Sequence, residues 1–154
     1  MRRTLLLLSL LGLAALALAG CGGGGDTAGG TLTKAEFVAQ ANAICKDYDA
    51  RIDALGEPGS IEDLVGLAEK AKPIAEDGVA KLRALKAPED LQASYDEYLA
   101  TGDVNIELVV QLGEAAKSGD VAAIEKIGTE GEDNADKAHG IAAELGLTEC
   151  AKSG

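Results

Sequence analysis

Apolar residues recur at alternating steps of three and four along the chain after residue 33, which is the spacing of one buried face of an α-helix. On one face, the first such stretch carries Val38, Ala41, Cys45, Tyr48, Ile52 and Leu55. Thr33 and Glu36 have the spacing of a capping box, in which each side chain bonds the other residue's free backbone N–H. The Gly- and Pro-containing segment 56–59 stops the pattern, so the sequence predicts a first helix between these two signals.

The next two apolar stretches predict two further helices. Ser60 is a residue type favoured at a helix N-cap, and the apolar pattern then runs to Leu85. Pro73 falls inside this pattern without changing its phase, which predicts one kinked helix and not two separate ones. Ala87-Pro88 is expected to begin the third helix, because proline fits the first helical turn.

A fourth stretch begins after Asp120, an N-cap candidate, and ends at Gly146, a glycine in the position of a C-terminal cap. The middle of its apolar face holds only small residues, namely Gly128, Gly131, Ala135 and Ala138. These residues are expected to allow close helix approach or to leave room for Tyr95 and Tyr98 across the core. Because short connections join long helices, the sequence predicts an all-α domain, an up-down-up-down antiparallel four-helix bundle.

The first 20 residues have the layout of an export signal. Two arginines precede an uncharged, Leu- and Ala-rich run of about 16 residues, which is shorter than the roughly 20 that a membrane-spanning helix needs. The run closes with residues 18–21, Leu-Ala-Gly-Cys, which resemble the lipobox of bacterial lipoproteins. We therefore expect cleavage between Gly20 and Cys21, a diacylglycerol on the Cys21 thiol, and lipid anchoring at the outer face of the cell membrane.

A glycine-rich segment separates this expected anchor from the folded part of the chain. Residues 22–30 read GGGGDTAGG and contain no large apolar side chain, so residues 21–32 are expected to form a disordered tether. The remaining segment, residues 33–154, has the length of one domain with a single core. The expected organisation is a signal peptide at 1–20, a lipidated cysteine with its tether, and one helical domain.

The exported chain is strongly acidic. Without the two arginines of the expected signal it carries 12 Lys and Arg side chains against 26 Asp and Glu, a formal charge of −14. Such a charge opposes nucleic-acid binding, which requires basic neutralisation of phosphates, and it opposes docking on anionic lipid surfaces. We therefore expect no nucleic-acid partner and a domain that is tethered to the membrane without lying on it.

The two cysteines of the helical domain are candidates for a disulfide. Cys45 lies on the apolar face of the first predicted helix, and Cys150 follows the fourth. In an up-down-up-down bundle the start of the first helix and the end of the fourth lie at the same end, and a fold-back of residues 146–150 would bring the two sulfurs together. Since such pairs are usually oxidised outside the cytoplasm, the sequence predicts a structural disulfide. A redox-active thiol is the alternative, although the Cys-x-x-Cys spacing is absent.

Few side chains have the spacing that catalysis or metal binding requires. Residues 103–114 place acids at several positions of an EF-hand loop, but Leu108 replaces the glycine that its sharp turn needs. Asp136 and His139 match one half of a di-iron motif, yet His139 is the one histidine of the chain and is expected to be exposed. There is no Gly-x-Ser-x-Gly elbow and no phosphate-binding loop. We therefore expect no enzymatic activity, no metal and no cofactor.

Two functions remain for the domain. The favoured one is a non-enzymatic interaction domain that binds an envelope protein and has a filled core. The alternative is a small-ligand or metal-ion binding protein with a pocket between the helices, whose candidate lining residues are Tyr48, Tyr95, Tyr98 and Asn105. A filled core would favour the first function, and a cavity lined by Tyr and Asn would favour the second.

Three segments also carry a resemblance to a group of proteins. They are residues 41–45, Ala-Asn-Ala-Ile-Cys; residues 82–88, Leu-Arg-Ala-Leu-Lys-Ala-Pro; and residues 145–150, Leu-Gly-Leu-Thr-Glu-Cys. They look like segments of small lipoproteins and secreted proteins of actinobacteria, a group without an assigned activity. The resemblance covers most of residues 33–150. It implies a helical domain in which Cys45 and Cys150 are paired, and it implies no catalytic residues.

Overall fold

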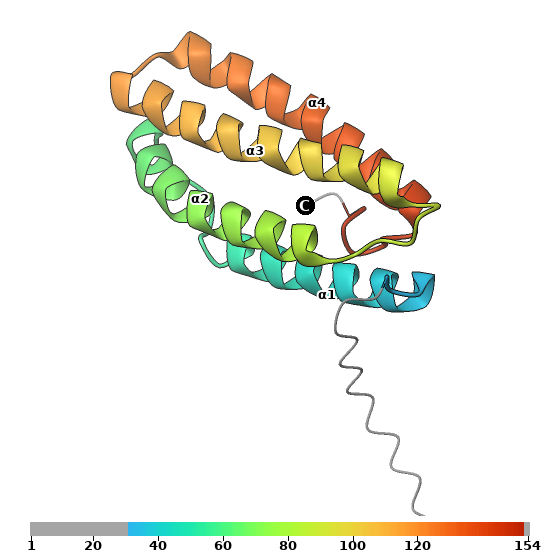
Figure 1. Ribbon diagram of the computed structural model, residues 1–154. Helices are drawn as coiled ribbons and strands as arrows, with labels where there is room; N and C mark the ends of the chain where they lie inside the picture. The colour runs from blue at the N-terminus through green and yellow to red at the C-terminus, as the bar shows by residue number, and fades with distance from the viewer. Residues whose placement is uncertain (1–30, 153–154) are drawn as a thin grey trace, which may run out of the picture.

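The computed structural model describes residues 31–152, which form four α-helices and no strand (Figure 1). The helices are α1 (Lys34–Asp53), α2 (Ile61–Ala84), α3 (Gln92–Ser118) and α4 (Val121–Leu145). Consecutive helices run in opposite directions, so the predicted all-α, up-down-up-down bundle is confirmed. The expected signal peptide, Cys21 and the glycine-rich run 22–30 lie outside the described residues. Within residues 31–152, no helix combines the length and apolar character needed to cross a membrane.

The helices begin and end where local side-chain chemistry favours it. Thr33 and Glu36 form the predicted capping box, with the Thr33 backbone N–H donating to the Glu36 carboxylate at 3.0 Å. Ser60 and Asp120 cap α2 and α4 by accepting hydrogen bonds from backbone N–H groups of the first turn. Gly146 ends α4 with a φ of 79°, a left-handed conformation that favours glycine.

The second helix runs through its proline, and the third starts later than predicted. Pro73 lies inside the continuous helix α2, so the chain is not broken there. Pro88 was expected in the first turn of the third helix, and this prediction is wrong. Its carbonyl oxygen instead accepts a hydrogen bond from the Leu91 N–H at 2.9 Å, forming a turn before α3. Because Ala87 is buried and Leu91 packs on the same core, the connection is anchored at both ends and α3 starts after it.

The main core lies at the end of the bundle where α1 begins and α4 ends. Phe37 and Tyr95 are fully buried, and their rings meet edge to face with centroids 4.7 Å apart. Leu145 and Leu147 close this core from the C-terminal side and are also fully buried. A smaller cluster at the other end of α3 and α4 contains Leu108, Ala115 and Ile127.

The closest helix approach involves α2 and α3, and not the glycines of α4. A Cβ atom at Gly128 or Gly131 would meet no atom within 4 Å, so the expected close approach along α4 does not occur there. A Cβ atom at Gly102 of α3 would lie only 2.7 Å from Cγ2 of Val79 in α2. The absent side chain of Gly102 therefore lets α2 and α3 form the tightly packed centre of the bundle.

Helix packing does not close the bundle on all sides. Within residues 31–152 the closely packed pairs are α1 with α2, α2 with α3, and α3 with α4, and the pair of α1 and α4 is not among them. Figure 1 shows the chain beyond α4 folding back toward α1. At the other terminus Leu32, expected to belong to the tether, packs on the core and donates a backbone hydrogen bond of 3.2 Å to the carbonyl of Lys86.

Candidate functional site

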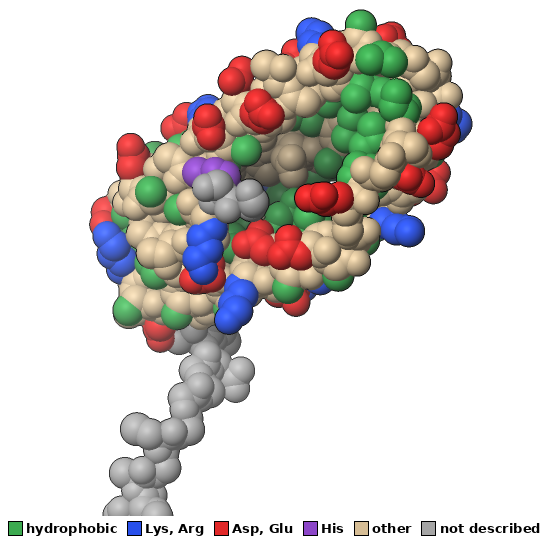
Figure 2. Space-filling model, turned by 180° about the vertical axis from the view of Figure 1, so that it is seen from behind, with side chains coloured by type: hydrophobic (Ala, Val, Ile, Leu, Met, Phe, Trp, Pro, Cys, Tyr) green, Lys and Arg blue, Asp and Glu red, His purple; other side chains and the backbone are tan. Residues whose placement is uncertain are grey.

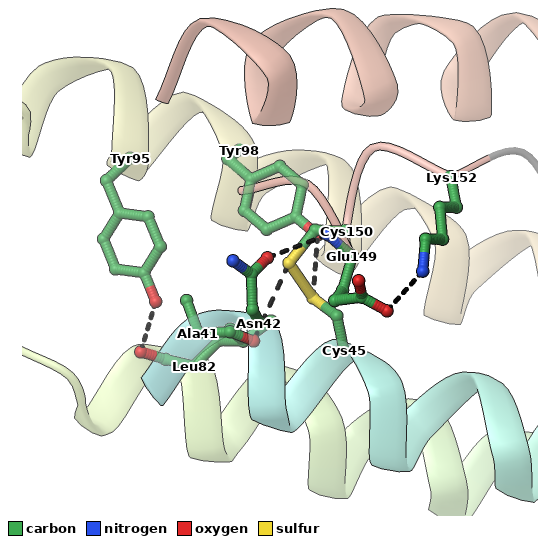
Figure 3. Close-up of a disulfide and its surroundings, with 9 residues drawn as sticks. All are labelled: Ala41, Asn42, Cys45, Leu82, Tyr95, Tyr98, Glu149, Cys150 and Lys152. Atoms are coloured by element: carbon green, nitrogen blue, oxygen red, sulfur yellow. Dashed lines mark hydrogen bonds and ion pairs between the residues drawn. A yellow bond between two sulfur atoms is a disulfide. The ribbon is translucent and has the colours of Figure 1, made fainter. Parts of the chain in front are cut away.

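A turn after α4 closes one end of the gap between α1 and α4 (Figure 3). The Leu147 N–H donates to the carbonyl of Ala142 at 2.8 Å, which reverses the chain directly after Gly146. The side-chain oxygen of Asn42 in α1 then accepts a hydrogen bond of 2.9 Å from the backbone N–H of Glu149. This contact places the C-terminal turn against α1.

The same turn carries one half of a disulfide. The sulfur atoms of Cys45 and Cys150 are 2.09 Å apart, so the predicted pairing and the fold-back that it required are confirmed. The Tyr98 hydroxyl lies 3.7 Å from the Cys45 sulfur. Because an oxidised sulfur carries no hydrogen, the hydroxyl is the donor in this weak contact. The disulfide therefore joins α1 to the segment after α4 across a seam that the helices leave open.

A cavity of about 230 Å³ adjoins this disulfide. Side chains from α1 and α4 form its two sides, side chains from α2 and α3 form its floor, and Cys45 and Cys150 contribute to its wall. Figure 2 shows a hollow on the face opposite to that of Figure 1, with hydrophobic side chains inside and acidic side chains around it. The cavity is thus an open groove with mostly apolar walls, formed where α1 and α4 are not closely packed.

Three of the four predicted pocket residues line this cavity. Tyr48, Tyr98 and Asn105 contribute to its walls, and the Asn105 amide donates a long hydrogen bond of 3.5 Å to the Tyr48 hydroxyl. The prediction for Tyr95 is wrong, because this ring lies in the closed core and not in the cavity. Its hydroxyl donates a hydrogen bond of 2.6 Å to the backbone carbonyl of Leu82.

Small side chains make the space for the cavity. Ala135 and Ala138 of α4 and Gly102 of α3 all contribute to its walls. The small residues of α4 therefore leave room, as expected, but the room is an open cavity lined by Tyr98. On the opposite side, a Cβ atom at Gly78 would lie 3.2 Å from the ring of Tyr48, so glycine there lets this ring pack closely against α2.

Helix α4 is held in place beside the cavity by polar contacts with α3. The Asn134 side-chain amide donates to the backbone carbonyl of Thr101 at 3.0 Å. The hydroxyl of the buried Thr101 donates in turn to the carbonyl of Tyr98 at 2.6 Å. Both Asn134 and Thr101 line the cavity, so these contacts fix the wall opposite α1.

Sequence reasoning missed three ionisable groups in the cavity wall, namely Asp49, His139 and Lys152, of which Lys152 is paired with Glu149. Asp49 follows Cys45 by one helical turn, so a carboxylate beside the apolar face of α1 was the signal that could have revealed it. His139 was expected to be exposed but is half-buried, because α4 turns this face toward the open seam. Neither Asp49 nor His139 forms a hydrogen bond or an ion pair with another residue between 31 and 152, although His139 and Lys152 are near enough to Asp49 to lower its pKa.

The walls of the cavity disfavour ionisation of the acids and phenols that they contain. Burial raises the pKa of Asp49, and the nearby carboxylates of Asp53 and Glu149 raise it further. Burial also raises the pKa of Tyr98 to about 12 and raises the pKa of Tyr48. The tyrosines are therefore neutral hydrogen-bonding groups over a wide pH range, while ionised Asp49 is a partly desolvated charge.

The residues considered for metal binding are not gathered into a site. Residues 103–114 belong to the continuous helix α3, and Asp103 pairs with Arg83 at 2.8 Å. Between residues 31 and 152, no group of three or more His, Cys, Asp or Glu side chains could hold a metal ion together.

Comparisons with family models, with curated proteins and with solved structures gave no match to this chain. Its chemistry has to be inferred from the site itself. The groove has an apolar floor, two phenol hydroxyls, side-chain amides, a lysine paired with Glu149, and one carboxylate and one imidazole with no partner among the described residues. Such a surface can enclose a small compound by burying its apolar part and bonding its polar end.

Proposed function

We propose that this chain is a lipoprotein of the cell envelope whose helical domain binds a small ligand in the groove between α1 and α4. The observation that carries the proposal is the cavity of about 230 Å³, which takes side chains from all four helices. Small-molecule sites are typically concave and mostly apolar, with a few well-placed polar groups and volumes of roughly 300–1,000 Å³. At about 230 Å³ the groove lies just below that range, which favours a compact ligand.

The alternative of a protein-interaction domain has less support. That function was expected to go with a filled core, whereas the seam of this bundle holds a cavity lined by Tyr48, Tyr98 and Asn105. Binding without catalysis is supported by the reactive groups of the same wall. Its cysteines are joined to each other, and its described residues include one histidine and no serine.

The proposed anchor rests on the sequence alone. The short positive start, the uncharged run and the Leu-Ala-Gly-Cys motif at residues 18–21 support export and lipidation of Cys21. A Cys21→Ala variant tests this directly by metabolic labelling with a fatty-acid analogue. We expect wild type to incorporate the label and the variant to lose it, and unchanged labelling of the variant would rule out the assignment.

The ligand is tested by recovering it with the protein. The full chain is purified from the envelope of its native host, extracted with organic solvent and analysed by mass spectrometry. Ala138→Phe places a large ring in the cavity wall, and Ala143→Phe makes the same change at an exposed position of the same helix. We expect wild type and Ala143→Phe to release a compound that Ala138→Phe lacks.

A second cavity variant, Ala135→Leu, covers the case in which Ala138→Phe does not fold, as judged by circular dichroism. A set of compounds that is identical for wild type and for a folded cavity variant would overturn the proposed function. Stoichiometric recovery of a partner protein without such a compound would also overturn it, in favour of the interaction domain.

A further inference from the structure

Resting on the proposed ligand site, we infer that the ligand is a small organic cation, an ammonium group carried on an apolar body, and that Asp49 binds the ammonium group. The apolar body would occupy the floor of the groove formed by α2 and α3. The chemical class follows from the groups of the wall that remain without partners.

Asp49 is the first of these groups. It lies in the cavity wall, is only half-exposed, and forms no ion pair or hydrogen bond with the other residues described between 31 and 152. A carboxylate that has lost part of its hydration without gaining a partner is unfavourable. Burial and two neighbouring carboxylates raise the pKa of Asp49 by more than Lys152 and His139 lower it, so the charge is incompletely compensated. A ligand cation would supply that compensation.

The other charged groups near Asp49 favour a cation over an anion. The carboxylates of Asp53 and Glu149 add negative charge near Asp49. Lys152 and His139 act in the opposite direction and lower the pKa of Asp49. The Lys152 ammonium is already paired with the Glu149 carboxylate, so its charge is balanced by a neighbour. An anion in the groove would therefore meet the Asp49 carboxylate, with one imidazole and a lysine already paired to Glu149 as the positive groups of the wall.

The aromatic side chains and the net charge point in the same direction. Tyr48 and Tyr98 contribute rings to the wall that contains Asp49, and aromatic faces attract organic cations. Their hydroxyls remain neutral, because burial raises the pKa of both phenols. The exported chain has a formal charge of −14, which raises the local concentration of cations and repels anions.

Calorimetric titration of the full chain with three water-soluble probes of one size tests the inference. The probes are 2-phenylethylammonium, the neutral 2-phenylethanol and the anionic 3-phenylpropionate. The protein is held in nanodiscs of zwitterionic lipid, and empty discs are titrated as the reference. Asp49→Asn removes the proposed partner of the cation, and Asp133→Asn removes the same charge from an exposed position of α4 outside the cavity wall.

We expect wild type to bind the ammonium probe at least about tenfold more tightly than the alcohol, because a hydrogen bond to a charged partner is worth about that much. Asp49→Asn should abolish this preference, while Asp133→Asn should retain it. The compound lost from Ala138→Phe should carry an amine or a quaternary ammonium group.

Two results would overturn the inference without touching the proposed function. One is equal or tighter binding of the alcohol or the carboxylate by wild type, and the other is a preference for the ammonium probe that survives in Asp49→Asn. A neutral or anionic compound recovered with wild type and absent from Ala138→Phe would have the same meaning. If no compound distinguishes wild type from the cavity variants, the proposed function itself fails.

Discussion

The hydroxyl of Tyr95 donates a hydrogen bond of 2.6 Å to the backbone carbonyl of Leu82, inside the closed core. Leu82 lies in the last turn of α2, and its carbonyl also accepts a hydrogen bond of 2.9 Å from the backbone N–H of Leu85, the residue that caps this helix. The Tyr95 side chain therefore stabilises the end of α2 and has no direct part in the cavity beside it.

Tyr95→Phe should consequently lower the free energy of unfolding by about 1 kcal/mol, the usual net contribution of such a bond. Chemical denaturation of the variant and wild type measures this loss. The ligand recovered with the protein should not change, because Tyr95 does not line the groove. Tyr98→Phe serves as the comparison, since its hydroxyl belongs to the cavity wall. Loss of ligand from Tyr95→Phe at unchanged stability would contradict this division of roles.

The disulfide should be the largest single contribution to stability. It joins residues 105 positions apart in the sequence, and a closed loop of that size stabilises by roughly 4–5 kcal/mol through the unfolded state. Replacing Cys45 and Cys150 together by serine should lower the free energy of unfolding by about that amount, as measured by denaturation.

Each single serine variant should lose as much stability as the double variant, because either one removes the whole link. Thiol counting on the unreduced wild type under denaturing conditions should find neither Cys45 nor Cys150 free. Additive losses in the two single variants would show that the cysteines act as separate buried side chains and not as a bond.

The architecture followed from the sequence because it depends on local signals. The capping box at Thr33, the N-caps at Ser60 and Asp120 and the left-handed glycine at Gly146 are each encoded within about one helical turn. Apolar periodicity then gave the four helices, and their short connections gave the antiparallel order. The start of α3 was missed because a buried turn, held by long-range packing of Leu91, displaced the helix from Pro88.

The site was predicted only in part because it depends on which seam of the bundle stays open. Tyr95 and Tyr98 are neighbours on one face of α3, so periodicity cannot tell which ring meets the core and which meets the cavity. The distinction arises because α1 and α4 are not among the closely packed helix pairs between residues 31 and 152. The same opening places Asp49 in the cavity wall, together with His139, which was expected to be exposed.

Two glycine-to-alanine substitutions should act in opposite directions. A Cβ atom at Gly102 would lie 2.7 Å from Cγ2 of Val79, so Gly102→Ala has to push α2 and α3 apart or move this stiff side chain. Overpacking of this kind costs about 1–3 kcal/mol, which outweighs the gain of up to about 1 kcal/mol in helix propensity. Gly128→Ala meets no atom and should stabilise by about 0.5–1 kcal/mol. Thermal unfolding separates the two, and stabilisation by Gly102→Ala would contradict the close packing.

Alkaline titration should unfold the domain before its tyrosines ionise freely. Burial raises the pKa of Tyr98 to about 12 and also raises the pKa of Tyr48 and Tyr95 above the ordinary value of 10.0. The folded state therefore holds protons that the unfolded state releases, so stability falls as the pH rises above about 10. Tyrosinate absorbance should appear together with the loss of helical circular dichroism. A tyrosinate signal that precedes unfolding would show that the phenols are solvated in the folded state.

Ionised Asp49 should stabilise the complex with the ligand and destabilise the domain without it. Its pKa is raised above the ordinary value of 3.8, first by burial and then by Asp53 and Glu149. Between the ordinary and the raised pKa the folded state binds more protons than the unfolded state, so its contribution to stability falls as the pH rises through that window. At neutral pH the ionised side chain therefore destabilises the empty protein.

Asp49→Asn should then raise the melting temperature of the ligand-free protein at neutral pH. The gain should disappear below the ordinary pKa of an aspartate, where wild type is protonated as well. Asp133→Asn, at an exposed position of α4, should change the melting temperature little at either pH. Equal gains for Asp49→Asn at both pH values would mean that packing, and not charge, limits stability at this position. A gain confined to neutral pH, together with the loss of cation binding, would mean that the carboxylate serves the ligand and not the fold.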